Sequence, residues 1–479
     1  MTSVVGHLSR EGQARLYAWL GLAVASLVGA GLFAALVALG RTPGIQGLLP
    51  AGDYFRWALV GHVNLAVVIW FLAFQGALWT LADGGQRSTL AWVGFGAAAA
   101  GAATLVLPAF MGWGQPVLSN YVPVLTHRAF AAGMALFAAG IGLAAAHTVR
   151  TVLARPRPWS LVACGGAITA GLVLIALLCF ALAAARLPVE APPSVAFEKL
   201  AWGGGHVLQF ANTAGMVLTW LLLARLTLGA DGLPRILDDR RAKRWLAAYL
   251  AIALPAPFFY ISEAPEGLFT LLMAVGLGPV TGTVGLILLW AVAARLRGGR
   301  GAREGALPDA SLSRDPGFSG LVFSIGLFGL GGALSLGIRG SNVVIPAHYH
   351  AVIGAVTVAF MGLSYHLLPL VGRTIWSERL ARVQPSLYGT GQTLFVLGLF
   401  WAGSHGVPRK TFGAAQGLHD PAQIAGMGLM GVGGLVAILG GIAFIVNMAG
   451  ALLGPPGARP APAPVAFGSD SRRTHDDPV

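Results

Sequence analysis

Hydrophobic residues in this chain gather in long runs that are separated by short polar segments. Apolar runs of roughly 18 residues or more are typical of helices that cross a membrane. This pattern predicts an all-α membrane protein, a twelve-transmembrane-helix bundle. The prediction of a span is weakest for the seventh and eleventh runs. The expected spans are residues 15–40, 54–82, 89–112, 122–148, 159–186, 198–228, 245–262, 267–296, 317–337, 346–370, 385–403 and 422–453.

The same pattern predicts one membrane domain and no separate soluble domain. Residues 1–453 form the expected twelve-span domain. Residues 454–479 are rich in Pro and Ala and then charged, so a disordered cytoplasmic tail is expected there. The first apolar run is too long for the core of a cleaved signal peptide, and we expect it to remain as the first span.

Basic residues are distributed unevenly over the two sides of this expected bundle. With the N-terminus inside, 23 of the 31 Lys and Arg residues fall on the inner side and 8 on the outer side. Because basic residues favour the cytoplasmic side, both termini are expected in the cytoplasm of a bacterial-type inner membrane. The outer eight are Arg41, Arg56, Arg128, Arg186, Lys199, Arg339, Arg409 and Lys410.

Composition agrees with a membrane protein and removes one alternative. The chain is 56% hydrophobic and 10% charged, which excludes a water-soluble protein that hides its apolar residues in one core. The net charge of +13 would suit nucleic-acid binding, but the charges lie in loops between apolar runs. We therefore expect lipid and no nucleic acid as partners.

Four histidines lie in the outer halves of three predicted helices. His62 and His206 each come about eight residues after the predicted start of a helix, and His348 and His350 lie near the start of the tenth. A single histidine inside lipid often bonds to a neighbouring carbonyl, but four at one depth indicate a shared function. The remaining histidines lie at helix ends, in loops or in the tail, where a structural role is expected.

The pair on the tenth helix can serve two partners at once. At about 100° per residue, His348 and His350 project roughly 200° apart. Two neutral imidazoles hold a six-coordinate haem that transfers electrons, whereas one imidazole leaves an open face for a gas or a second metal. His62 with His350 would make the first kind of site. His348 would make the second, with its open face towards His206.

At this point the chain resembles the catalytic subunit of the haem-copper oxidase superfamily, namely cytochrome c oxidase subunit I and the nitric oxide reductase large subunit. The resemblance covers about residues 10–453 and rests on the twelve spans, both termini inside, and three sequence motifs. These motifs are Arg56-Trp57-Ala58-Leu59-Val60-Gly61-His62-Val63-Asn64-Leu65, Trp202-Gly203-Gly204-Gly205-His206 and His348-Tyr349-His350.

The resemblance implies a fold of the haem-copper oxidase type, an oxidoreductase activity in respiration and two haems, expected to be b-type. His62 and His350 would be the axial ligands of the low-spin haem, and His348 the ligand of the high-spin haem. His206 would bind a second metal, copper or non-haem iron. Arg56 and Arg339 would contact haem propionates or, equally well, anchor the chain at the interface.

The chain departs from the family at the second metal. The family has two adjacent histidines on helix seven, where this sequence has Phe258 and Phe259, which offer no lone pair. Glu263 and Glu266 could complete a His/carboxylate site, although both are expected in an outer loop. Copper or iron beside His206 is therefore doubtful, and so is oxidase turnover. Proton pumping has weak support, because nearly all acidic residues lie in loops.

Three functions remain open. The first is a terminal reductase of O2 or NO. The second is a haem subunit without the binuclear centre that transfers electrons or binds a gas. The third, a transporter or structural protein without cofactor, is disfavoured by the shared depth of the histidines. No haem c attachment motif or copper-thiolate site is present, so a cytochrome c-type or other electron-donor subunit is expected.

Overall fold

A computed structural model of the chain describes residues 8–45, 54–120, 122–188, 190–229, 232–261, 266–297 and 309–455. The predicted tail beyond Pro455 lies outside the described residues. Helices dominate the described part, together with one antiparallel pair of two-residue strands, β1 and β2. The elements are α2 (Arg10–Leu39), α3 (Tyr54–Val63), η2 (Asn64–Ile69), α4 (Trp70–Ala82), α5 (Thr89–Met111), β1 (Pro116–Val117), β2 (Val124–Leu125), α6 (Arg128–Leu153), α7 (Leu161–Ala185), α8 (Pro193–Leu228), η4 (Arg235–Leu237), α9 (Asp239–Ala253), η5 (Ala256–Tyr260), α10 (Glu266–Arg297), α11 (Asp309–Leu312), α12 (Pro316–Ser335), α13 (Val344–Leu367), η6 (Leu368–Val371), α14 (Glu378–Ser404), η7 (Gly413–Gln416) and α15 (Pro421–Leu453).

Within these residues, 10 helices are long and apolar enough to cross a membrane. The twelve-span prediction is therefore met only in part, and the two exceptions are the seventh and eleventh predicted spans. In the seventh, α9 has 15 residues and is short for a bilayer. In the eleventh, α14 is long, but it begins with Glu378, Arg379 and Arg382, and its polar first half makes it less apolar on average.

Helix boundaries follow polar caps and prolines. Ser9, Ser88 and Ser160 accept a backbone N–H at the starts of α2, α5 and α7, as N-cap residues do. Asp420 forms a capping box with Gln423 at the start of α15. These contacts satisfy N–H groups that the first helical turn leaves unpaired.

Several predicted boundaries were wrong, among them the starts of the first and eleventh spans, which lie at Arg10 and Glu378. Helix seven does not run over 245–262: α9 ends at Ala253, before Pro255, and the 3-10 helix η5 follows. Helix four starts at Arg128 and not at 122, because the preceding residues form the β1–β2 pair. Helix six starts five residues earlier than expected, at Pro193, a residue whose fixed φ suits the first helical turn.

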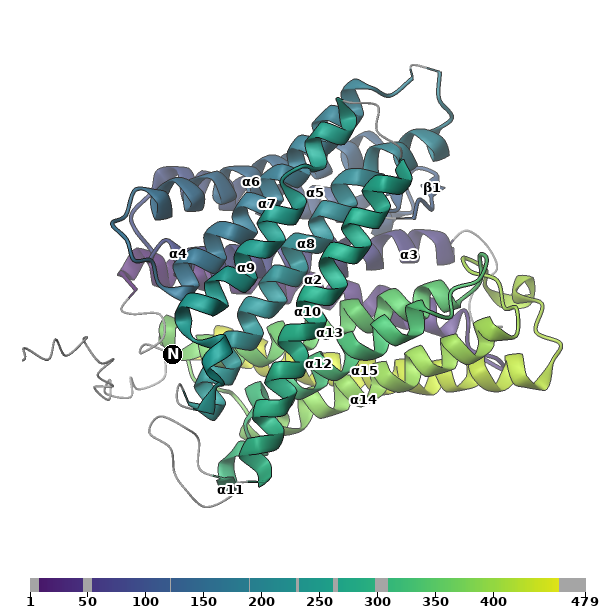
Figure 1. The fold of residues 1–479 in the computed structure, drawn as a ribbon. Helices are drawn as coiled ribbons and strands as arrows, with labels where there is room; N and C mark the ends of the chain where they lie inside the picture. The colour runs from purple at the N-terminus through teal and green to yellow at the C-terminus, as the bar shows by residue number, and fades with distance from the viewer. Residues whose placement is uncertain are drawn as a thin grey trace, which may run out of the picture.

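The histidine-bearing helices lie at the centre of the bundle. Sequential helices pack side by side as α5 with α6, α7 with α8, α12 with α13 and α14 with α15, and α15 returns to pack on α2 (Figure 1). The most apolar windows of α8 and α13 are 83% buried, against 33% for α2, α5 and α15. Side chains on α8 and α13 are therefore shielded from the surroundings of the bundle by outer helices.

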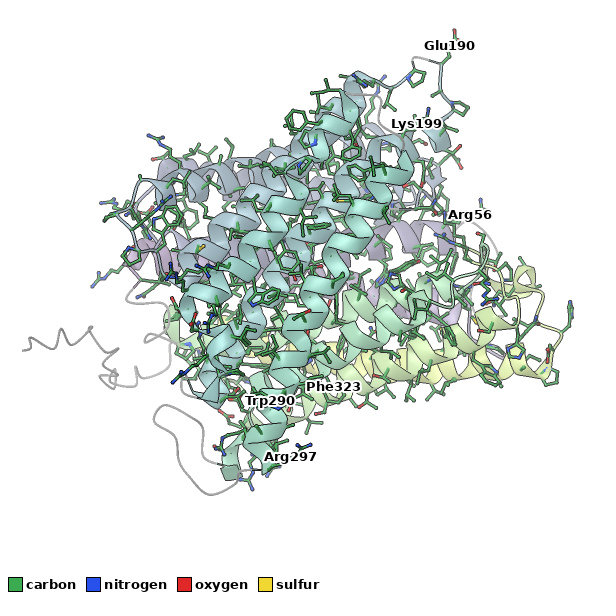
Figure 2. All side chains as sticks on the ribbon, in the orientation of Figure 1. Arg56, Glu190, Lys199, Trp290, Arg297 and Phe323 are labelled. Atoms are coloured by element: carbon green, nitrogen blue, oxygen red, sulfur yellow. The ribbon has the colours of Figure 1, made fainter. Side chains whose placement is uncertain are left out.

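The two ends of the bundle carry separate polar networks. We call the end where α3, α8 and α13 begin the α3 end, and the opposite end the Asp83 end. Arg56 and Lys199 lie at the α3 end and Arg297 at the other (Figure 2). At the Asp83 end, the buried Arg15 guanidinium makes two bonds of 3.0 and 2.8 Å with the buried Asp83 carboxylate.

Candidate functional site

His62 lies one residue before the end of α3, and its ring is oriented by the neighbouring helix. Its Nδ1 is 3.0 Å from the carbonyl oxygen of Ala30 on α2. A carbonyl can only accept, so Nδ1 carries the proton and Nε2 of the neutral ring keeps its lone pair. The π-helical segment η2 begins two residues later, and its buried Asn64 donates to the carbonyls of Val60 and Pro123.

His348 and His350 lie in the first two turns of α13 and have different neighbours. His348 Nδ1 is 2.8 Å from the carbonyl oxygen of Gly331 on α12, which again leaves Nε2 as the ring nitrogen with a lone pair. The His350 ring packs 5.0 Å from the Phe395 ring on α14. His350 also lies near enough to His62 for the two rings to influence each other electrostatically. The fold thus brings His62 and His350 together from α3 and α13.

His206 sits among aromatic rings. Its Nδ1 is 2.6 Å from the carbonyl oxygen of Trp202, one turn earlier on α8. Its ring centroid lies 5.1 Å from the Trp202 ring and 5.8 Å from the Phe269 ring on α10.

The residues at the place of the family's helix-seven histidines, Phe258 and Phe259, provide no metal ligand near His206. Phe259 packs 5.1 Å from Phe269, so it belongs to the same aromatic group, whereas Phe258 is 65% exposed. Glu263 lies outside the described residues, and the same holds for the side chain of Glu266. Across the side chains that the structure describes, no three His, Cys, Asp or Glu residues form a group able to hold a metal ion. These described neighbours of His206 do not fit a second metal.

Two arginines besides those singled out from the sequence lie near the residues of the histidine pair. Arg56 and Arg339 are exposed. In contrast, Arg41 and Arg409 are close enough to Tyr349, the residue between His348 and His350, to interact with it electrostatically. Each has a buried Nε without a hydrogen-bond partner.

Burial lowers the pKa of Arg41 to about 10, with nearby Tyr349 acting in the opposite direction. Arg41 therefore stays charged at neutral pH. Together, Arg41 and Arg409 provide two cations that an anionic group could pair with. The sequence offered no local signal for this pair, since 368 positions separate its members and the chain fold alone brings them together.

Hydrogen bonds tie the loops of the α3 end to one another. Arg41 donates to the carbonyl of Pro408 at 3.2 Å. Lys410, two residues on, donates from Nζ to the carbonyl of Leu118 and, at 3.1 Å, to Oδ1 of Asn120. Asn120 in turn donates its backbone N–H and its Nδ2 to the Glu198 carboxylate near the start of α8. The loop that carries Arg409 is thereby linked to the helix that carries His206.

Two further histidines have acidic partners, consistent with the structural role expected for them. His147 Nε2 lies 3.3 Å from the buried Asp83 carboxylate, and His366 Nε2 lies 3.2 Å from Asp315. Both pairs lie at the Asp83 end. They contribute to the network there and are not part of the histidine group on α3, α8 and α13.

Residues 317–448 match the family model described as cytochrome c and quinol oxidase polypeptide I. An uncharacterized protein of Aquifex aeolicus is 28% identical over 376 residues, which cover 76% of this chain and 87% of that protein. Cytochrome c oxidase subunit 1 of Thermus thermophilus is 25% identical over 520 residues, covering 97% of this chain and 90% of that protein.

The fold has a counterpart among solved structures. A heme-copper terminal oxidase dimer, determined by cryo-EM, matches with a TM-score of 0.74 and 19% identity, covering 94% of this chain and 86% of that one. Fold and sequence together define a multi-span membrane protein of the oxidase type. The chain is a haem-copper oxidase subunit I-like protein.

Proposed function

We propose that this chain is a membrane subunit that binds two haems, of which one transfers electrons and the other binds a gas. His62 and His350 would be the axial ligands of the low-spin haem, and His348 the protein ligand of the high-spin haem. The observation that carries this proposal is the approach of His62 and His350 from two separate helices. The similarity to haem-copper oxidases supports it.

The side chains around these histidines suit haem ligation. Metal-binding histidines usually donate their second ring N–H to a carbonyl or carboxylate, which fixes the ring and the tautomer. His62 and His348 both have such a carbonyl partner on a neighbouring helix. Arg41 and Arg409 would pair with haem propionates in the role expected for Arg56 and Arg339.

Bound haem would supply reversible one-electron transfer and, where one axial position is open, a site for O2 or NO. The chain's residues would hold and orient the two groups and neutralise their propionates. Electrons would come from a cytochrome c-type or other donor subunit. We place the protein in a bacterial-type inner membrane with both termini cytoplasmic.

Reduction of O2 or NO is the second candidate function, and the similarity to the Thermus cytochrome c oxidase subunit favours it. In this family such turnover uses a second metal opposite the high-spin haem. Around His206 the described side chains are aromatic rings, so we derive no step through copper or non-haem iron. The gas-binding and electron-transfer function is therefore preferred.

Haem and metal analysis of the purified chain, produced with sufficient haem and combined with a reduced-plus-carbon-monoxide spectrum, tests the proposal. We expect two haems per chain, of which one binds carbon monoxide, and less than a stoichiometric amount of copper or non-haem iron. One copper or iron per chain would favour reductase turnover instead. A colourless preparation without Soret absorbance would refute haem binding altogether.

A further inference from the structure

Helix α9 carries basic residues at its start and small apolar residues further along, on one and the same face. Arg240, Arg244, Ala247 and Ala251 follow one another at the spacing of a single helix face. All four are exposed, and we call them the α9 stripe. The opposite face, which includes Leu246, is buried where α9 packs against α7, α8 and α10 (Figure 1).

The two arginines of the α9 stripe stand where an α-helix disfavours positive charge. Helix α9 begins at Asp239, so Arg240 lies in its first turn, where the helix dipole repels cations. Arg244 lies one turn further on, and like charges four residues apart repel each other. An anion bound between the two guanidinium groups would relieve both of these costs.

The acidic residues at the start of α9 pair with other cations. Asp239 lies 2.6 Å from Arg225 and 3.0 Å from Lys243. Asp238 lies 3.6 Å from Arg241. None of the acidic side chains that the structure describes pairs with either arginine of the α9 stripe. Both guanidinium groups are therefore available to an external anion, and guanidinium binds phosphate through two parallel hydrogen bonds.

The start of α9 lies level with the start of a membrane span. Lys243 Nζ donates to the carbonyl of Trp159 at 2.6 Å, and Trp159 comes two residues before the first residue of α7. Helix α7 is long and apolar enough to cross a membrane. The guanidinium carbon of Arg157 lies 4.7 Å from the centroid of the Trp159 ring. Tryptophan and basic residues are typical of the headgroup layer, where lipid phosphates lie.

We propose that the α9 stripe binds an anionic phospholipid, with its phosphate between Arg240 and Arg244 and an acyl chain along Ala247 and Ala251. Alanine side chains project little from a helix, so the chain can lie close against α9. Inorganic phosphate would contact the two arginines alone, whereas a phospholipid contacts the whole stripe. This site lies at the Asp83 end and does not depend on the haem binding proposed above.

The lipid bound to purified protein measures this preference. The protein is equilibrated in mixed micelles of phosphatidylglycerol and phosphatidylcholine with identical acyl chains, re-purified, and its lipid quantified by mass spectrometry. Wild-type protein should retain phosphatidylglycerol preferentially. One basic residue at an anionic headgroup strengthens binding about fivefold, so Arg240→Gln combined with Arg244→Gln should lower the preference by about tenfold or more. Arg240→Lys with Arg244→Lys keeps both charges and should keep most of the preference.

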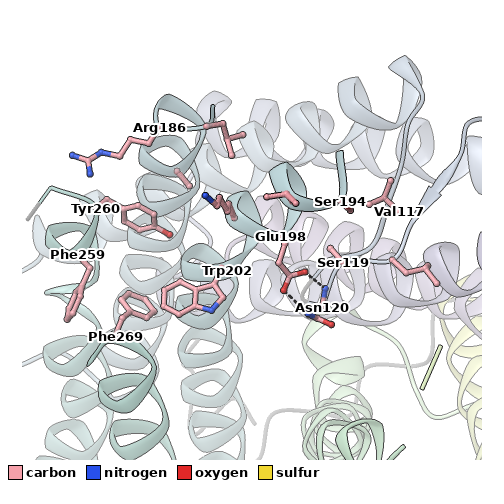
Figure 3. Close-up of a pocket in the computed structure, with 15 residues that line it drawn as sticks. Val117, Ser119, Asn120, Arg186, Ser194, Glu198, Trp202, Phe259, Tyr260 and Phe269 are labelled. Atoms are coloured by element: carbon pink, nitrogen blue, oxygen red, sulfur yellow. Dashed lines mark hydrogen bonds between the residues drawn. The ribbon is translucent and has the colours of Figure 1, made fainter. Parts of the chain in front are cut away.

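Arg186→Gln combined with Lys199→Gln is the matched control. These two residues are also exposed cations, so the control removes the same charge. They lie at the α3 end, where they line a cavity of about 640 Å³ (Figure 3). Their replacement should leave the preference for phosphatidylglycerol unchanged. An equal loss in the two glutamine double variants would show that net charge alone matters, and would overturn the site on α9.

Two measurements on the wild-type protein complete the test. Excess inorganic phosphate, compared with chloride at the same ionic strength, should displace no phosphatidylglycerol, because phosphate lacks the chain that contacts Ala247 and Ala251. Displacement by phosphate would overturn the lipid proposal in favour of a simple anion site. Added sodium chloride should lower the preference, because salt screens exposed charges. A preference that salt does not change, or no preference at all, would contradict binding through the two arginines.

Discussion

At the scale of single residues, the tautomers of the histidines constrain the chemistry most. Each of His62, His206 and His348 has its Nδ1 near a backbone carbonyl, so the lone pair of the neutral ring is on Nε2. For His206 the carbonyl belongs to its own helix, whereas for His62 and His348 it belongs to a neighbouring one. Only the latter two rings are therefore fixed relative to a second helix.

Removing one histidine at a time should separate the two haems. His62→Ala or His350→Ala should abolish the low-spin haem spectrum, because a single imidazole cannot keep iron six-coordinate. His348→Ala should abolish the carbon monoxide-binding haem and spare the other, and His206→Ala should change haem content little. Absorption and EPR spectra of the purified variants provide the measurement.

His405→Ala serves as the control for these substitutions. His405 is also at the α3 end, and its Nδ1 lies 2.8 Å from the carbonyl oxygen of Trp401 on its own helix, but the side chain is exposed. Its removal should leave both haem spectra unchanged. An unaltered low-spin spectrum in His62→Ala or His350→Ala would show that the axial ligands are assigned incorrectly.

The half-buried Arg41 near Tyr349 should influence the haem midpoint potential. Replacing Arg41 with Gln removes a positive charge that favours the reduced, less positive iron, so the potential should fall. An interaction of about 1 kcal/mol corresponds to roughly 40 mV for one electron. Spectroelectrochemical titration measures the shift, and exposed Arg56→Gln is the control, for which we expect a smaller change. A larger shift for Arg56→Gln would favour the assignment made from the sequence, in which Arg56 contacts a haem propionate.

At the scale of elements, the sequence predicted where most helices lie but not how they are interrupted. Long apolar runs located the spans, since hydropathy reports burial in lipid or protein directly. The π-helical turn after His62 leaves no mark in hydropathy, because Asn64–Ile69 is as apolar as its surroundings. The end of α9 was signalled by Pro255, but the apolar residues after it concealed that end. The early start of α8 was signalled by Pro193, but the charged Glu198 and Lys199 suggested a later start.

For the site, the spacing of His348 and His350 and their depth relative to His62 led to the prediction that His62 and His350 act together. The structure places these two histidines near each other, and their role as haem ligands stays a prediction. The proximity of Arg41 and Arg409 to Tyr349 arises from two distant loops, so no window of sequence could show it. The aromatic rings around His206 come from α8, η5 and α10. The sequence showed that the phenylalanines of η5 offer no lone pair to a metal, but it did not show that rings from three elements would gather around His206.

At the Asp83 end, the buried ion pair joins α2 to the end of α4. The side chains of Arg15 and Asp83 are 2% and 1% exposed. Arg15→Ala would remove the guanidinium that pairs with the buried Asp83 carboxylate, so the free energy of unfolding should fall by roughly 3–5 kcal/mol. Arg87→Ala is the matched control. Arg87 pairs with Glu11 at the same end but is 93% exposed, so its loss should cost at most about 1 kcal/mol. Denaturant unfolding in detergent compares the two, and similar losses would contradict a structural role for the buried pair.

At the scale of the whole molecule, polar contacts and basic residues divide the bundle into two chemically distinct ends. Buried helices α8 and α13 carry His206, His348 and His350 near the α3 end, and loop contacts through Asn120 and Lys410 cover that end. The Asp83 end combines ion pairs with the basic segment around α9. If basic residues set the orientation, the Asp83 end faces the cytoplasm and the histidines lie in the outer half of the membrane.

This orientation can be tested with reporter insertions at both ends. A reporter after Leu233, before the basic residues of η4 and α9, should report the cytoplasm, and one after Gly406, in the loop that carries Arg409, should report the opposite side. Opposite signals require an odd number of crossings between the two insertions, which is the case when α9, α10, α12, α13 and α14 all cross or when both α9 and α14 fail to cross. If α9 alone or α14 alone failed to cross, the two reporters would give the same signal, and a further pair of reporters before and after each helix would identify which one. A reporter after Leu233 that lies outside the cytoplasm, together with one after Gly406 that lies in the cytoplasm, would show that the topology is inverted. The histidines would then lie near the cytoplasm, where an external cytochrome could not donate electrons to them.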